Sequence, residues 1–242
     1  MSFFGYSMSI KLKKKNQKDP YYVEPSMQKK ILGSSSQYLE DIFIESIFRS
    51  KKNGFYVDVG ANDPNELSNT KRFYDLGWSG INIEPNTKMH DQLCRARPRD
   101  INLNIGIGAA PAELIFYELS PDTLSSFNKK SAFDNIKNGS ASLISEKKIQ
   151  VQPLSEVFEE FTGGNQIDFL SLDSEGYEYE ILTSNNWVLY RPTAIIAEVN
   201  QDEGAHVLNF LTGQSYSMIH YNGTNAIFVD ETSPLIKAYL EA

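Results

Sequence analysis

The chain has few cysteines, few histidines and a shortage of basic residues, and each shortage excludes a class of protein. Cys94 is the only cysteine among 242 residues, which excludes internal disulfides and fits a reducing compartment. Three histidines and one cysteine offer no Cys/His cluster for zinc. The formal net charge of −8 argues against a protein that grips the phosphate backbone of nucleic acids. Cys94 follows the apolar rhythm of Met89 and Leu93, and we expect it in the core.

The sequence also lacks any apolar run of the length that a transmembrane helix needs. Lysines near the N-terminus are not followed by an apolar region and a cleavage site, so no signal peptide is indicated. We expect a soluble cytoplasmic protein, with residues 1–35 as a partly mobile N-terminal arm. An alternative use of that arm is contact with a membrane surface through Phe3 and Phe4. Residues 36–242, within a chain that is 40% apolar, suit a single domain.

Three arginines, Arg95, Arg97 and Arg99, form a small basic cluster after a predicted helix at 87–96. We interpret the cluster as a solvated turn. Contact with an anionic substrate is the alternative.

Residues 55–60 predict a buried strand that ends in a tight turn. Phe55, Val57 and Val59 alternate with Tyr56 and Asp58, a pattern typical of a central strand. Gly60 lets the chain turn sharply and lets a ligand approach the backbone.

A helix is predicted to follow this turn. Asp63 is a candidate N-cap, Pro64 occupies the favoured first helical position, and Glu66 completes a capping box. The helix should run to about Leu76 and end at Gly77. Its free N-terminal amides and positive dipole end would hold an anionic group at the strand tip.

The composition of the turn distinguishes two ligands. A dinucleotide site requires G-x-G-x-x-G after the strand, whereas here a single glycine is followed by Ala61, Asn62 and Asp63. Asp63 and Glu66 would also repel a pyrophosphate. Glu84 ends the second predicted strand, where a carboxylate can accept the ribose hydroxyls of NAD or of S-adenosylmethionine (SAM). The turn therefore favours SAM.

Several spaced segments resemble the FkbM-type methyltransferase family, within the class I SAM-dependent methyltransferases. In chain order they are SQYLEDIFIESIF at 36–48, GFYVDVGANDP at 54–64, SNT at 68–70, GWSGINIEPN at 77–86, LSSF at 124–127, IDFLSLDSEGYEYEIL at 167–182 and NAIFV at 225–229. The resemblance covers roughly residues 36–230. It implies an α/β, Rossmann-like fold with a seven-stranded sheet and with SAM at the carboxyl ends of the strands.

The resemblance also implies O-methylation, typically of a sugar or other secondary-metabolite hydroxyl. For this chain it suggests surface polysaccharide or glycolipid biosynthesis, with a small-molecule or glycan acceptor that carries a free hydroxyl. The family commonly has a second glycine soon after the GAN triplet, where this chain has Asp63 and Pro64. That departure bears on sub-family and substrate more than on SAM binding.

Three carboxylates are the candidate catalytic residues. Asp173 and Glu175 follow the predicted strand 167–172, and Glu198 lies near the end of the strand 194–199. A carboxylate near the reacting methyl group can act as base, orient the hydroxyl or help hold Mg²⁺. Because a hard-cation site needs convergent oxygens, we assign no metal ligand. The structural alternatives are a helix cap for Glu175, a bonded strand-end carboxylate for Asp173 and structural pairing for Glu198.

The candidate cofactor-binding residues lie at the strand tips and in the first turn. They are Asp58, Gly60, Ala61, Asn62, Ser68, Glu84, Pro85, Ile107 and Asp173. We expect Asp58 to bond turn amides beneath the ligand, Ser68 and Thr70 to reach the carboxylate of SAM, and Ile107 to lie beside adenine. Gln37 and Asp41, on a leading helix at 37–48, are further pocket candidates.

The rest of the chain alternates between predicted strands and helices. One further helix is expected to be capped by Ser155, with Val157, Phe158 and Phe161 inward. Other helices are expected at 177–185 and at about 203–212, and further strands at 101–107, 112–119, 149–153, 216–221 and 225–229. This order predicts a mostly parallel sheet with helices on both faces and an antiparallel edge hairpin. Residues 120–146 are polar and lack periodicity, which indicates a lid or a mobile insertion.

Two other functions compete with the methyltransferase. Glu84 also suits an NAD-dependent oxidoreductase, and a SAM-like fold can serve as a non-catalytic binding protein. The single turn glycine argues against the first, and the acidic residues at both strand ends argue against the second.

Overall fold

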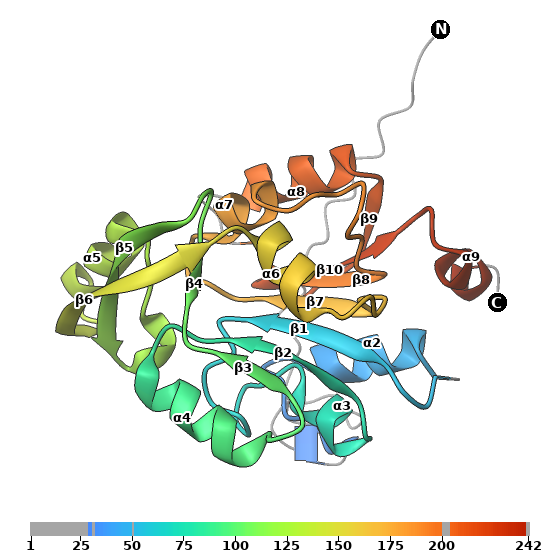
Figure 1. Ribbon diagram of the computed structural model, residues 1–242, viewed down its shortest axis with the longest axis horizontal. Helices are drawn as coiled ribbons and strands as arrows, with labels where there is room; N and C mark the ends of the chain where they lie inside the picture. The colour runs from blue at the N-terminus through green and yellow to red at the C-terminus, as the bar shows by residue number, and fades with distance from the viewer. Residues whose placement is uncertain (1–28, 31, 50, 200–203, 241–242) are drawn as a thin grey trace, which may run out of the picture.

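The computed structural model describes residues 29–30, 32–49, 51–199 and 204–240 (Figure 1). Most of the predicted N-terminal arm, including Phe3 and Phe4, and the start of the helix predicted at 203–212 lie outside these residues. None of the helices within the described ranges is both long enough and apolar enough to cross a membrane.

A seven-stranded sheet forms the centre of the molecule, in the order β3-β2-β1-β7-β8-β10-β9. Its strands are β1 (Phe55–Val59), β2 (Ser79–Ile83), β3 (Ile101–Leu103), β7 (Phe169–Leu172), β8 (Ala194–Glu198), β9 (Tyr216–Tyr221) and β10 (Asn225–Asp230). The pairs from β3 to β8 are parallel, whereas β10 runs antiparallel to both neighbours. The predicted mostly parallel sheet with a closing hairpin is confirmed.

A second sheet of three strands, in the order β4-β6-β5, lies beyond one end of the first, at the left of Figure 1. It contains β4 (Gly106–Ile107), β5 (Ala112–Ser120) and β6 (Ser142–Gln152). The 3₁₀ turn η1 (Asp122–Leu124) and helix α5 (Lys129–Lys137) connect β5 to β6.

Helices cover both faces of the main sheet, as predicted. Alternation along β1 sends Phe55, Val57 and Val59 to one face and Tyr56 to the other. The first face packs against α6 (Leu154–Phe161), α7 (Glu178–Thr183) and α8 (Gly204–Gly213). The second packs against α2 (Glu40–Ile47), α3 (Lys71–Asp75) and α9 (Pro234–Leu240). All five side chains of β1 are buried, so this strand is the centre of the core.

The predicted start of the helix after β1 is wrong. Asp63 does accept the amides of Asn65 and Glu66, at 2.8 and 3.0 Å, but no helix continues from this turn. Leu67 has a left-handed φ of 55°, which breaks helical geometry, and α3 begins only at Lys71. Local capping signals therefore form a turn without a helix behind it.

The predicted end of that helix at Gly77 is confirmed. Gly77 has a φ of 97°, and its amide donates to Tyr74 O, while the Trp78 amide donates to Phe73 O. These two bonds form a Schellman motif, which satisfies the last carbonyls of α3. Helix α4 (Thr87–Ala96) matches its predicted range, with the Asn86 side chain accepting the Lys88 amide at its start.

The strand predicted at 101–107 is two strands in two sheets. β3 pairs with β2, whereas β4 pairs with β6. Between them the Asn104 side chain donates to the carbonyls of Glu84 and Pro85, at 2.8 and 3.1 Å. These bonds hold the chain where it passes from one sheet to the other.

Residues 120–146 are more regular than their composition indicates. They contain η1, α5 and the first part of β6, which begins at residue 142 and is longer than the predicted strand at 149–153. β6 pairs with β5 along nearly its whole length. The sequence of this region lacks an alternation of apolar and polar residues because both faces of the β5–β6 hairpin are largely exposed, and not because the chain is irregular.

Two smaller predictions are wrong. Cys94 is exposed, because Met89 and Leu93 form the buried stripe of α4 and leave the next position outside. Ser155 does not cap α6, which begins one residue earlier at Leu154, where the amide donates to the Ser184 hydroxyl.

Candidate active site

A cavity of about 380 Å³ lies at the carboxyl ends of β1, β2 and β7. Its walls come from the turn after β1, the residues after β2 and β7, and the segment 122–127. The crevice beyond the carboxyl ends of parallel strands is the usual ligand site in such sheets. All nine predicted cofactor-binding residues line this cavity.

The turn after β1 is held tightly between its two neighbouring strands. The Gly60 and Ala61 amides donate to Ile83 O at 3.0 and 3.3 Å. Gly60 has a φ of 77°, and a Cβ on it would lie 1.8 Å from the carbonyl oxygen of Asp173. Only glycine fits a backbone approach this close, so the turn brings the tips of β1 and β7 together.

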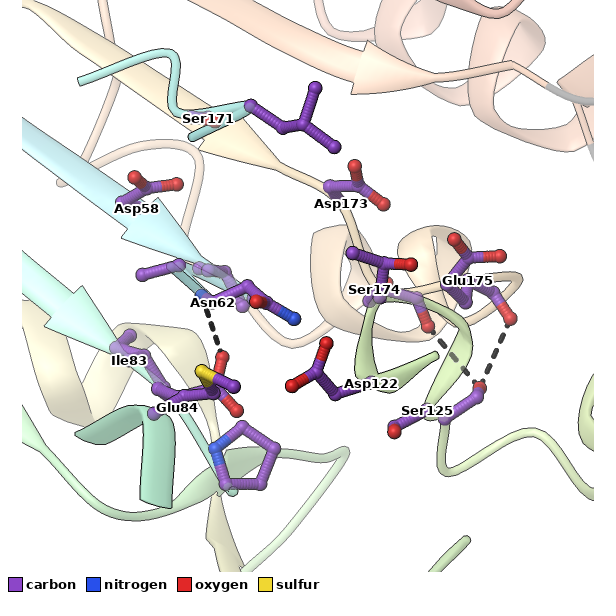
Figure 2. A pocket seen from close by; sticks show the side chains of 18 of the residues that line it. Asp58, Asn62, Ile83, Glu84, Asp122, Ser125, Ser171, Asp173, Ser174 and Glu175 are labelled. Carbon is purple, nitrogen blue, oxygen red and sulfur yellow. Dashed lines mark hydrogen bonds between the residues drawn. The ribbon is translucent and has the colours of Figure 1, made fainter. Parts of the chain in front are cut away.

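Glu84 bridges the turn after β1 and the chain after β2. One carboxylate oxygen accepts the Asn62 amide at 2.8 Å, as Figure 2 shows. The other accepts the Asn86 amide at 2.7 Å. The residue is 4% exposed, and burial raises the pKa of Glu84 to about 7 against the effect of these bonds. Each oxygen keeps a second acceptor position, so the carboxylate can still bind hydroxyls at the cavity.

The predicted anion site at this turn is not formed by its first amides. The amides of Gly60, Ala61 and Asn62 are bonded to Ile83 O and Glu84, and no helix N-terminus follows them. Ser68 and Asn69 instead supply polar side chains at this part of the wall. Asn69 Nδ2 also donates to Ser171 Oγ on β7, at 3.1 Å.

Asp58 lies beneath the cavity and bonds a hydroxyl in place of the predicted amides. It is 4% exposed and accepts the Thr70 hydroxyl at 2.6 Å. Burial raises the pKa of Asp58, while the Thr70 bond and the charge of Arg97 act in the opposite direction. Thr70 is thus directed to Asp58 and does not line the cavity.

The predicted solvated arginine turn is wrong for Arg97. Its side chain is 2% exposed and donates to Pro64 O, Ser68 Oγ and Thr70 Oγ1. Arg95 is exposed, as predicted, and the Arg99 guanidinium lies 3.8 Å from the centre of the Tyr74 ring.

Asp173, Glu175 and Glu198 come together at the ends of β7 and β8. One carboxylate oxygen from each lies within 4.8 Å of the other two. Asp173 and Glu175 line the cavity, and Figure 2 shows both on the side opposite Glu84. Glu198 is half-buried next to them, and its Oε2 has no hydrogen-bond partner among the described residues. Among those residues, this is the one group of three acidic side chains spaced to hold a metal ion.

Burial and mutual repulsion raise the pKa values of all three carboxyl groups. Burial is the largest cause for each, although the Asp173 carboxylate also meets solvent inside the cavity. Repulsion from Glu178 raises the pKa of Asp173 further, and repulsion from Asp173 raises that of Glu175. The pKa of Glu198 rises to about 8 for the same reasons. The group therefore retains protons near neutral pH.

Glu175 does not cap the following helix, which corrects the structural alternative for this residue. The N-cap residue of α7 is Tyr177, which makes no side-chain cap bond. The carboxylate of Glu178 instead holds the turn before the helix, where it accepts the Ser174 amide at 2.7 Å and the Gly176 amide at 3.1 Å. Glu175 instead has a left-handed φ of 54°. Ser126 Oγ donates to the carbonyls of Glu175 and Ser174, at 3.0 and 3.3 Å, and holds this turn in place. Glu178 was missed because carboxylates three residues apart look equivalent in sequence.

The segment 122–127 forms part of the cavity wall. It lies within residues 120–146, for which the sequence indicated a lid or a mobile insertion, but none of its residues was among the predicted site residues. Asp122, Thr123, Leu124, Ser125, Ser126 and Phe127 all line the wall. In Figure 2 Asp122 lies between Glu84 and the Ser174–Glu175 turn. The resemblance at 124–127 was the available signal.

Of the two further pocket candidates, one lines the cavity and the other does not. Gln37, before α2, lines the cavity. Asp41 does not, because its carboxylate accepts the hydroxyls of Ser34 and Ser36 at 2.6 and 2.9 Å. The predicted helix at 37–48 is shorter in the structure, where α2 covers Glu40–Ile47.

The charge of the cavity wall favours SAM over NAD, the two cofactors that the sequence left as alternatives. The wall carries seven acidic residues, while no lysine, arginine or histidine is among the described residues that line it. They are Asp58, Asp63, Glu66, Glu84, Asp122, Asp173 and Glu175. Such a wall repels the pyrophosphate of a dinucleotide and suits the positively charged sulfonium and ammonium groups of SAM.

The comparisons with known proteins identify the family. The fold and the cavity are those of a SAM-dependent methyltransferase. The methyltransferase FkbM domain model matches residues 58–218, which is more than half of the chain, and the chain therefore belongs to this family. The family membership selects the methyltransferase over the oxidoreductase and the non-catalytic protein. A search of curated proteins finds no match.

Solved structures with a related arrangement are distant in sequence. One is a precorrin-6y C5,15-methyltransferase from Geobacter metallireducens GS-15, with a TM-score of 0.41, 13% identity, and coverage of 79% of this chain and 87% of that chain. Another is a putative S-adenosyl-L-methionine-dependent methyltransferase from Methanococcus maripaludis, with a TM-score of 0.38, 11% identity, and coverage of 86% and 92%.

Proposed function

We propose that this methyltransferase transfers a methyl group to a hydroxyl of a sugar, in the biosynthesis of a surface polysaccharide or glycolipid in the cytoplasm. The observation that carries the proposal is the convergence of Asp173, Glu175 and Glu198 at the end of the SAM cavity. SAM, when bound, supplies a methyl group on a positively charged sulfur. The protein must then align the acceptor, exclude water and remove the hydroxyl proton.

The three carboxylates supply the acceptor for that proton. A general base works best when its pKa lies near the operating pH, and the pKa of Glu198 is raised to about 8. The pKa values of Asp173 and Glu175 are raised as well. The group of three carboxyl groups can therefore gain or lose one proton near neutral pH at little cost in free energy. We propose that the three carboxyl groups together hold fewer than three protons before transfer, and that the hydroxyl proton passes to the group through Glu175, which lines the cavity. Asp173 and Glu198 share the remaining negative charge with it.

An uncharged acceptor with several hydroxyls fits the remaining wall. The carboxylates accept hydrogen bonds from hydroxyls, whereas a phosphate or carboxylate on the acceptor would be repelled by them. A neutral sugar offers several hydroxyls and carries no negative charge, so it fits this wall. Methylation of a sugar is also what the family resemblance implies.

We assign Glu84 to the ribose hydroxyls of SAM and Ile107 to its adenine, with Gly60 and Ala61 allowing close approach. Asp58 supports the wall, Asn62 and Pro85 line it, and Ser68 contacts the methionine part. These assignments are supported by the fact that all of these residues line the same cavity. We also propose that residues 122–127 act as a lid, because Ser126 joins this segment to the Glu175 turn.

Binding and transfer are tested separately. SAM and S-adenosylhomocysteine should raise the melting temperature, and NAD should not, because a ligand that binds only the native state stabilises it. Transfer is tested by offering labelled SAM and a panel of neutral sugars, anionic sugars and amines. Methylation confined to amines or anionic sugars would contradict the acceptor proposal while leaving SAM binding intact.

Variants test the role of the carboxylates. Glu175→Gln should lower turnover at least about a hundredfold, since general-base catalysis contributes on that order, and SAM affinity should change little. Glu159→Gln is the matched control, because Glu159 is an exposed residue of α6 outside the cavity. Unchanged turnover in Glu175→Gln would remove this residue from proton transfer.

The same three carboxylates are the group that would hold Mg²⁺ if the enzyme used it. We propose that they act without it, because removal of a hydroxyl proton by a carboxylate requires no cation. Turnover should therefore be unchanged after treatment with EDTA. Loss of turnover that Mg²⁺ restores would assign the group to a metal instead.

A further inference from the structure

Arg97 is a charged side chain buried beside the active site, on the side away from the ligand. It follows α4 and is 2% exposed. Its backbone is fixed at both ends, since its amide donates to Leu93 O at 2.8 Å and its carbonyl accepts Asn102 Nδ2 at 3.1 Å. Burying a guanidinium is unfavourable unless hydrogen bonds replace its hydration, so its contacts indicate what it does.

Those contacts join three points of one segment. Arg97 Nη2 donates to Pro64 O at 2.6 Å and to Ser68 Oγ at 2.8 Å, and Nη1 donates to Thr70 Oγ1 at 2.6 Å. All three acceptors lie in residues 61–70, which we name the cofactor loop. A planar guanidinium can reach several acceptors in a fixed arrangement, whereas a lysine ammonium cannot reproduce that geometry.

The other side of the cofactor loop forms a wall of the cavity. Seven of its ten residues line the cavity, namely Ala61, Asn62, Asp63, Glu66, Leu67, Ser68 and Asn69. The loop contains no helix, and both Asn62 and Leu67 have left-handed φ values, of 46° and 55°. Such backbone geometry persists only where the surroundings impose it, and Arg97 bonds the loop on either side of Leu67.

Arg97 also connects the loop to the floor of the cavity. The Thr70 hydroxyl accepts from Arg97 and donates to Asp58 Oδ2 at 2.6 Å. Asp58 is on β1 and lines the cavity, while Arg97 does not line it. One buried side chain therefore fixes the loop relative to the central strand without reaching the ligand.

We propose that Arg97 is a positioning residue for SAM binding, which holds the cofactor loop in the conformation that the cofactor requires. Without it the loop samples other conformations, and the apparent affinity falls by the fraction of molecules that remain competent. The inference does not depend on the acceptor, because binding of SAM can be measured without any transfer.

The test compares Arg97→Met with Arg95→Met, which removes the same charge from an exposed position in the last turn of α4. By calorimetry, Arg97→Met should weaken binding of SAM and of S-adenosylhomocysteine about tenfold, which corresponds to a loop that is competent about a tenth of the time. The KM for SAM should rise by a similar factor, with kcat at saturating SAM changed less than about threefold. Arg95→Met should match the wild type.

Hydrogen exchange on the ligand-free protein provides a readout that is independent of activity. In Arg97→Met, peptides covering residues 61–70 should exchange faster, while peptides from β1 and β7 should not. Wild-type affinity and wild-type exchange in a folded Arg97→Met protein would overturn the proposal.

Two further variants serve if Arg97→Met does not fold. Arg97→Lys keeps the charge but removes the planar guanidinium that reaches several acceptors at once. Thr70→Val keeps the side-chain shape but removes the hydroxyl that links Arg97 to Asp58. Each should weaken SAM binding and speed exchange in the cofactor loop. Wild-type SAM affinity in both would overturn the proposal.

Discussion

Replacing Gly60 with alanine tests the close approach on which the active site is built. The Cβ of alanine would lie 1.8 Å from the carbonyl oxygen of Asp173, so the tips of β1 and β7 would have to separate by more than about 1 Å. That movement would strain the bonds from Asp173 N to Val59 O, at 3.1 Å, and from Gly60 N to Ile83 O, at 3.0 Å.

The free energy of unfolding should fall by two contributions. A left-handed φ costs an L-residue about 1–2 kcal/mol, and Gly60 has a φ of 77°. Loss of one or two buried backbone bonds adds about 1–3 kcal/mol. The total is about 2–5 kcal/mol. Each kcal/mol lowers the melting temperature of a domain of this size by about 2–4 °C.

Gly77→Ala is the control that separates these contributions. Gly77 has a φ of 97° but nothing within 4 Å of its Cβ position, so only the backbone contribution should be lost. Denaturant unfolding should place Gly60→Ala at least about 1 kcal/mol below Gly77→Ala, within the range of one lost buried bond. SAM affinity should fall in Gly60→Ala alone. Equal losses of stability in the two variants would refute the argument that the strand tips are in contact.

Three other predictions concern the carboxylates. Glu198→Gln should stabilise the protein by about 1–3 kcal/mol at pH 8.5 but not near pH 4.5. The pKa of Glu198 is raised to about 8 in the native state, so between about pH 4.5 and pH 8 the native state holds a proton that the unfolded state releases. Wild-type stability therefore falls as the pH rises through this range. A difference in melting temperature that does not depend on pH would contradict this prediction. Glu175→Gly should relieve the φ of 54° and raise stability by about 1 kcal/mol while turnover is lost, and lowered stability would contradict the strain. Ser126→Ala should lower kcat more than SAM affinity, because two carbonyls of the Glu175 turn lose their donor; steady-state kinetics with unchanged kcat would exclude this role.

Strand tips were predictable from the sequence because their signals are local. Alternating apolar residues define β1, the single Gly60 defines its turn, and Glu84 follows directly from the end of β2. The parallel order of the strands then brings Glu84 and Asp173 to one edge of the sheet. Helix α4 was equally accessible, since Asn86 caps it and its buried stripe has helical spacing.

The errors lie where partners distant in sequence decide the outcome. Asp63 and Pro64 present a complete helix start, but the Pro64 carbonyl accepts from Arg97, 33 residues away, instead of from a helical amide. The same contact explains why Arg97 was mistaken for a solvated residue. Individual residues of the segment 122–127 were not predicted for the site, because the position of the segment depends on the bond between Ser126 and the Glu175 turn, which no periodicity encodes.

The acidic wall connects cofactor binding to proton release. Carboxyl groups with raised pKa values, including Glu84 at about 7 and Glu198 at about 8, hold protons near neutral pH because burial, and to a smaller extent repulsion between nearby negative charges, disfavours their ionised forms. A bound cation favours their ionised forms and lowers these pKa values, so SAM binding should release protons. Calorimetry at pH 7.5 in buffers of different ionisation enthalpy measures the number of protons released per SAM bound. S-adenosylhomocysteine lacks the sulfonium charge and should release fewer protons; equal release for both ligands would mean that the sulfonium does not lie near these carboxylates.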